Sequence, residues 1–107
     1  MTAWHALLLA GLLEIVWVFG LKYSDGFTRL WPSIGTIVAI GLSFALLALS
    51  LKGVPFGTAY AVWTGIGAAG TAVIGILLFG ESADLTRLVC VTLIITGTIG
   101  LKLAASV

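Results

Sequence analysis

Charged and metal-ligating side chains are scarce in this sequence. Only 8% of its 107 residues are charged, the formal net charge is +1, and it holds one cysteine and one histidine. The single cysteine, Cys90, excludes an intramolecular disulfide, and we expect it to be a small buried residue of an apolar segment. One histidine and one cysteine cannot assemble the usual metal cluster, so we expect no metal. There is no basic patch for nucleic acid and no nucleophile–base pair or cofactor motif, so we expect neither a nucleic-acid partner, a cofactor nor an enzyme.

Apolar residues, by contrast, make up 61% of the chain, and the mean hydropathy is +1.25. A soluble domain of this length cannot bury so much apolar surface. Four apolar runs are separated by short polar breaks, and each run is about long enough to cross a bilayer as a helix. We therefore expect an all-α integral membrane protein, a single domain over 1–107 with four transmembrane helices. Their approximate spans are 3–21, 32–51, 57–79 and 85–105.

The first run does not resemble a cleavable signal peptide, because no basic segment precedes it and no small-residue cleavage site closes it. We expect a multi-pass protein of the plasma (inner) membrane. Three basic residues, Lys22, Arg29 and Arg87, fall on one side of the membrane. Lys52 falls on the other side, joined by Lys102 if its side chain reaches the interface. So small a bias leaves the orientation open and is compatible with insertion in both directions.

One carboxylate, Glu14, lies near the centre of the first apolar run. An acidic side chain at that depth destabilises insertion by about 3 kcal/mol, which favours a functional role. Gly11 and Trp17 lie three residues before and after Glu14, so the three share a helix face. Gly11 leaves space there, and the indole N–H of Trp17 can orient the carboxylate. We favour an ion or proton site over the alternative, a structural glutamate bonded to a neighbouring helix.

Further polar and aromatic side chains lie inside the second and third runs. Ser43 is one of few hydroxyls in the middle of the second run, and Tyr60 and Trp63 share a face of the third with Thr64 beside them. Together with Glu14 these side chains suit a small organic cation, because a carboxylate supplies charge and aromatic faces attract cations. For Tyr60 and Trp63 an aromatic belt at the membrane interface is a nearly equal alternative.

A mechanism follows from Glu14. Desolvation favours the protonated carboxyl, whereas a bound cation favours the ionised form, so proton and cation compete for one group. Such competition is the minimum needed for antiport. Gly65 and Gly67 are candidate hinge residues because both are weak helix formers, although glycine is also simply common in membrane helices.

Small residues also recur in the last run. Thr92, Thr96, Gly100 and Ala104 repeat every four residues, a stripe that allows close approach of another helix, either within one chain or from a second copy.

The single histidine, His5, lies at the start of the first run. Its side chain is either at the membrane interface or part of a proton relay.

With these residues assembled, the chain resembles the small multidrug resistance transporters over all four spans. The motifs that carry the resemblance are Glu14, the loop at 22–33 and the segment Gly57-Thr-Ala-Tyr-Ala-Val-Trp-Thr-Gly-Ile-Gly67. The resemblance implies an antiparallel, dual-topology homodimer with one substrate site between two copies of Glu14, and proton-coupled export of cations. It also implies that Tyr60 and Trp63 line the pocket. The fourth helix would be the main dimer contact, through Thr92, Thr96, Gly97 and Gly100.

The segment Glu14-Ile-Val-Trp17 and the tail Gly100-Leu-Lys102 resemble the guanidinium-exporting branch of that family, in which Lys102 acts as a marker. The resemblance therefore implies a proton-coupled antiporter of guanidinium and small guanidinium-like cations. A broader exporter of quaternary ammonium ions and other drugs is the alternative within the family. Outside it, the residues leave open a passive channel built on Glu14 and a non-transporting partner of another membrane protein.

Overall fold

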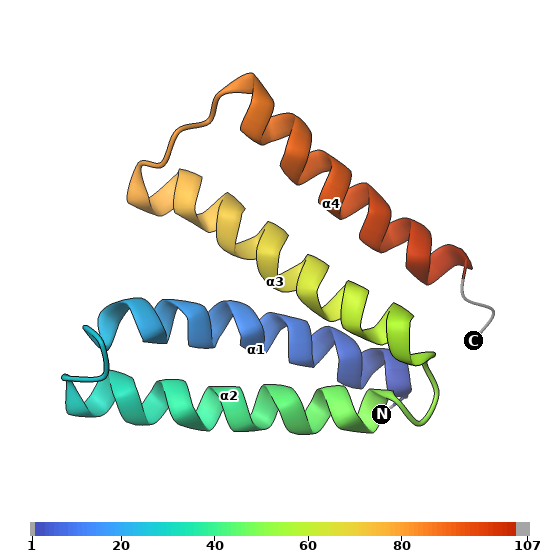
Figure 1. Cartoon of the computed structure of the whole chain (residues 1–107), viewed down its shortest axis with the longest axis horizontal. Coiled ribbons are helices and arrows are strands. Elements are labelled where there is room, and N and C mark those ends of the chain that lie inside the picture. The colour runs from blue at the N-terminus through green and yellow to red at the C-terminus, as the bar shows by residue number, and fades with distance from the viewer. Residues whose placement is uncertain (1, 105–107) are drawn as a thin grey trace.

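The computed structural model describes residues 2–104 of the protein, which form four helices joined by short loops. The helices are α1 (Ala3–Tyr23), α2 (Leu30–Ser50), α3 (Phe56–Phe79) and α4 (Leu85–Ala104). All four are long and apolar enough to cross a membrane. Figure 1 shows α1 and α2 side by side and antiparallel, with α3 beside α1 and α4 on the far side of α3. The fold is thus an all-α membrane bundle in which α1 and α3 lie between α2 and α4.

The helix ends follow from local side-chain chemistry. The α1 helix runs to Tyr23, two residues past the expected span, and the Ser24 hydroxyl then donates to the Leu21 carbonyl at 2.7 Å. The α2 helix begins two residues early, at Leu30, and holds Pro32 in its first turn, where a missing N–H has no partner within the helix to lose. The expected end of the last span, residue 105, lies outside the described residues.

Side chains cap the N-termini of α1 and α4. Asp84 accepts a hydrogen bond from the backbone N–H of Arg87 at 2.9 Å, so it caps α4 as its position suggests. Thr2 caps α1, and His5 completes a capping box with it: the His5 backbone N–H donates to the Thr2 hydroxyl at 3.2 Å, and the Thr2 backbone N–H donates to the His5 ring Nδ1 at 3.4 Å. The structure therefore gives His5 a capping role at the start of α1.

Glycines bring the helices into close contact. The side chain of Ile66 on α3 fills the space that a Cβ at Gly11 would need, with its own Cβ 2.8 Å from that position. Ile15 of α1 overlaps the corresponding position at Gly70, so glycines on both helices admit isoleucines of the other. Such close approach is how membrane helices gain packing energy without a hydrophobic driving force.

The α4 helix is the outlying element of the bundle. Within the described chain its backbone packs beside α3 alone, and none of its residues is buried. The contact is close at one point, where Gly65 of α3 admits the Thr98 hydroxyl. Cys90, expected to be buried, is exposed because it lies on this helix. The described chain therefore leaves most of α4 uncovered.

Candidate functional site

Glu14 lies near the middle of α1 and faces α3. Its carboxylate occupies the space over Gly67, where an added Cβ would overlap Glu14 Oε1. Of the four acidic residues in the sequence, only Glu14 lies within a helix. The absence of a side chain at Gly67 is therefore what allows a carboxylate to sit between two membrane-spanning helices at this depth.

The Glu14 carboxylate opens onto a cavity of about 400 Å³ between α1 and the middle of α3. We call this the Glu14 cavity; it is lined by Glu14, Val18, Thr64, Gly67, Ala68, Thr71, Ala72 and Glu81. The Thr71 hydroxyl is buried and has no hydrogen-bond partner within residues 2–104. In the same range no group of three His, Cys, Asp or Glu side chains could hold a metal ion. The cavity thus offers the Glu14 carboxylate and the free Thr71 hydroxyl, within the described residues, to a small polar ligand.

Three helices meet in a buried chain of hydrogen bonds at Ser43. The indole Nε1 of Trp63 on α3 donates to Ser43 Oγ on α2 at 3.0 Å, and Ser43 Oγ donates to the Ala10 carbonyl on α1 at 2.7 Å. Ser43 is fully buried and Trp63 is 7% exposed. These two predicted pocket residues therefore join α1, α2 and α3 one turn before Glu14. They position the helix that carries Glu14 and do not line the Glu14 cavity.

We predict that Ser43→Ala lowers the free energy of unfolding in detergent by about 1 kcal/mol, as measured for hydrogen bonds between membrane helices. Trp63→Phe should have a similar effect, and the double variant should lose less than the sum because both changes break one shared bond. Ser50→Ala is the matched control, since buried Ser50 donates only within its own helix, to Leu47. If the losses of unfolding free energy from Ser43→Ala and Trp63→Phe are additive, the two side chains do not share a stabilising hydrogen bond.

The other predicted pocket residues lie in different surroundings. The Trp17 indole Nε1 is buried and has no hydrogen-bond partner within residues 2–104, so the structure does not contain the expected bond to Glu14. Tyr60 is 57% exposed and stands beside Trp63, with ring centroids 5.9 Å apart. Gly11 packs against Ile66 as described above. Of the polar and aromatic side chains predicted for the site, Glu14 and Thr64 line the Glu14 cavity.

The expectation of a hinge at Gly65 and Gly67 stays a prediction. The α3 helix is continuous through both residues. Each glycine also has a packing reason to lack a side chain, because Gly65 admits Thr98 and Gly67 admits Glu14.

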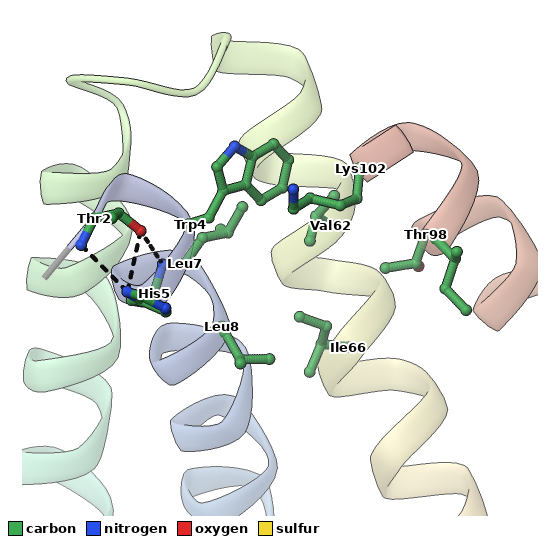
Figure 2. A pocket seen from close by; sticks show the side chains of 10 residues that line it. Thr2, Trp4, His5, Leu7, Leu8, Val62, Ile66, Thr98 and Lys102 are labelled. Carbon is green, nitrogen blue, oxygen red and sulfur yellow. Dashed lines mark hydrogen bonds between the residues drawn. The ribbon is translucent and has the colours of Figure 1, made fainter. Parts of the chain in front are cut away.

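Cations and aromatic rings meet at both ends of the bundle. At the end of α1, the rings of Phe19 and Phe79 stack with centroids 5.5 Å apart, and Lys22 Nζ lies 4.8 Å from the Phe79 ring centroid. At the opposite end, Lys102 Nζ lies 4.5 Å from the centre of the Trp4 ring (Figure 2). Lys102 therefore ties the end of α4 to the start of α1 by a cation–π contact.

A second, larger cavity of about 720 Å³ lies beneath the Lys102–Trp4 contact. Its lining includes aliphatic side chains of α1 and α3, such as Leu8 and Ile66, as Figure 2 shows. This cavity does not contain Glu14. We therefore place the candidate site at the smaller cavity, which holds the membrane-embedded carboxylate.

Thr71, Gly67 and Glu81 contribute to the Glu14 cavity but were not predicted from the sequence to line it. Thr71 is one hydroxyl among several small residues of α3, and Gly67 was considered only as a hinge. Glu81 follows α3 by two residues and lines the same cavity as Glu14. Spacing within one helix cannot reveal such contacts, because they join α1, α3 and the following loop.

Comparisons with known proteins bear on the whole chain. Residues 2–94 match the family model described as Small Multidrug Resistance protein. A "Guanidinium exporter" of Yersinia pseudotuberculosis is 61% identical over 103 residues, which cover 96% of this chain and 99% of the relative. Proteins of the same name from Proteus vulgaris and Salmonella typhimurium are 59% and 60% identical over similar lengths. The four apolar helices make this a multi-pass membrane protein, which in bacteria means the inner membrane. The chain belongs to the small multidrug resistance family of transporters, and the three relatives described above are named guanidinium exporters.

Proposed function

We propose that this protein exports guanidinium and small guanidinium-like cations in exchange for protons, and that Glu14 binds the two in turn. The observation that carries the proposal is the placement of Glu14: a carboxylate in the middle of a membrane-spanning helix, facing a cavity of about 400 Å³. The relatives named guanidinium exporters, about 60% identical over nearly the full length, support the choice of substrate.

Coupling follows from the chemistry of a buried acid. In a low-dielectric site an unpaired carboxylate is unfavourable, so the group is stabilised either by a proton or by a cation, and not by both at once. A site that opens to each side of the membrane in turn then exchanges one for the other. An inward proton gradient would drive the cation out.

Guanidinium suits this site better than a bulky cation does. It is planar and binds a carboxylate through two parallel N–H···O hydrogen bonds. The cavity also presents the hydroxyl of Thr71, which has no partner within the described residues and can accept a further N–H. A flexible hydrophobic cation without N–H groups could form neither the two parallel hydrogen bonds to the carboxylate nor the bond to the Thr71 hydroxyl.

The proposal includes an antiparallel homodimer, with the two copies of Glu14 sharing one substrate site. One protomer leaves α4 without a buried residue. On α4, Thr98 faces α3, while Thr96 and Gly100 lie two residues away on either side and hence on roughly the opposite face. Nothing lies within 4 Å of a Cβ added at Gly100. The stripe of Thr92, Thr96 and Gly100 is thus free for a second copy, whereas Gly97 lines the groove beside α3.

We predict that Gly100→Leu shifts the protein toward monomers by about 10-fold in the dissociation constant, because a bulky residue prevents close approach of small-residue helix faces. Sedimentation equilibrium in detergent measures this constant. Gly35→Leu is the matched control, since Gly35 on α2 also has open space around an added Cβ. A dimer unaffected by Gly100→Leu would place the contact on another face.

Purified protein in liposomes tests the function. We expect guanidinium uptake that is driven by an opposed proton gradient and that dissipates it, with much slower flux of tetrapropylammonium under the same gradient. Equal flux of the two cations would support a broader exporter instead. Guanidinium current that leaves the proton gradient unchanged would indicate a passive channel, and no flux of either ion would contradict transport by this protein.

A further inference from the structure

Glu81, in the loop between α3 and α4, lines the same cavity as Glu14. We propose that Glu81 is an entry site for the cationic substrate at the loop end of this cavity, and that Arg87 is a built-in competitor for it. The inference rests on the proposed function, because it assigns a second binding residue to the same transport pathway.

The two carboxylates lie over glycines of one helix. Glu14 lies over Gly67, and the carboxyl carbon of Glu81 lies 2.9 Å from where a Cβ at Gly75 would be. These glycines are eight residues apart, which is about 12 Å along an α-helix. Thr71 lies midway between them at four-residue spacing, lines the cavity and has a buried hydroxyl without a partner within residues 2–104. Glu81, Thr71 and Glu14 thus place polar groups in sequence from the loop to the membrane interior.

Arg87 shows what kind of group Glu81 accepts. The Nη1 atom of Arg87 lies 3.5 Å from Glu81 Oε1, so a guanidinium is already held at this carboxylate. Both side chains are about half exposed, at 53% and 54%. An exposed pair of this kind is weak and exchanges readily, so a free guanidinium ion can replace the Arg87 side chain.

The other carboxylates near this end do not compete for the role, since neither Asp25 in the loop between α1 and α2 nor Asp84 lines the cavity. Asp84 accepts a hydrogen bond from the first turn of α4 and is committed to capping it. Lys22 lies against the Phe79 ring and adds positive charge. Glu81 is therefore the loop carboxylate that faces the cavity, and removing it leaves the opening net positive, which repels an approaching cation.

Initial rates of guanidinium uptake into liposomes, measured over a range of concentrations, test the inference. Glu81→Gln should raise KM by about five-fold, the factor expected for one charge contact in a well-hydrated site, and leave the maximal rate within about two-fold. Arg87→Gln should lower KM, because it frees Glu81. Glu81→Asp, which keeps the charge, should stay near the wild-type KM. The KM difference should shrink at high salt, since exposed charges are screened.

A purely structural ion pair predicts a different pattern. Glu81→Gln and Arg87→Gln both break the pair, so they would then change transport in the same direction, and the inference would be wrong. An unchanged KM in both variants, with wild-type exchange of guanidinium for protons intact, would also overturn the inference and leave the proposed function standing. Absence of proton-coupled uptake in the wild-type protein would instead contradict the proposed function itself.

Discussion

Glu14→Gln is expected to abolish proton-coupled export of guanidinium. The amide can neither release a proton nor pair with a cation, so the variant loses both halves of the exchange. Removing one partner of a buried charge pair destabilises the bound state by about 3 kcal/mol. This corresponds to a transport rate about 100-fold or more below wild type at equal protein density. The measurement is guanidinium uptake into liposomes with and without an opposed proton gradient.

Glu14→Asp is the matched control for this prediction. The shorter acid keeps an ionisable carboxyl in the cavity, so we expect slower transport that still responds to the proton gradient. Glu14→Gln protein that transports guanidinium with a normal dependence on that gradient would show that coupling occurs elsewhere.

Gly67→Ala has the second largest expected effect. An added Cβ would overlap the Glu14 carboxylate, so the carboxylate must leave its position over α3 or the two helices must separate. Overpacking of this kind destabilises a protein by about 1–3 kcal/mol, and we expect transport to fall by about 10-fold or more. Gly57→Ala is the control on the same helix, because a Cβ there meets no atom within 4 Å. Liposome uptake and the midpoint of thermal unfolding in detergent measure both effects.

A second variant separates two reasons for a glycine at position 67, namely space for the Glu14 side chain and flexibility of α3. If space is the reason, Glu14→Asp should partly restore transport to Gly67→Ala, because the shorter side chain needs less space over α3. A hinge at Gly67 predicts no such recovery, since the identity of the acid does not affect the flexibility of α3. If the single variant Gly67→Ala transports as fast as the wild type, neither the need for space nor a hinge at Gly67 is supported.

Much of the fold follows from the sequence because the bilayer permits few solutions. An apolar run of about 20 residues must satisfy its backbone hydrogen bonds internally, so each of the four runs becomes a helix. The depth of Glu14 and the cap at Asp84 follow from position along the chain in the same way. Such features depend on one segment at a time.

Contacts between helices are less accessible to sequence reasoning. Trp63 and Ser43 are predicted as pocket residues from their chemistry, but in one protomer they bond to each other and to α1. Glu81 carries the charge of an ordinary loop residue, and only the turn after α3 brings it to the Glu14 cavity. Cys90 is apolar enough for a core, yet it is exposed because its helix packs beside α3 alone. These outcomes depend on which helix faces meet.

The most direct test of the shared site is proton release on binding. Guanidinium is titrated into purified wild-type protein in weakly buffered detergent while a pH indicator records the protons released, with Glu14→Gln protein as the control. If proton and cation occupy the site in turn, the wild type releases protons in proportion to the guanidinium bound. This release is expected over the pH range in which the empty site is protonated. Glu14→Gln is expected to release no protons. Saturable guanidinium binding by the wild type with no proton release at any pH would contradict the account.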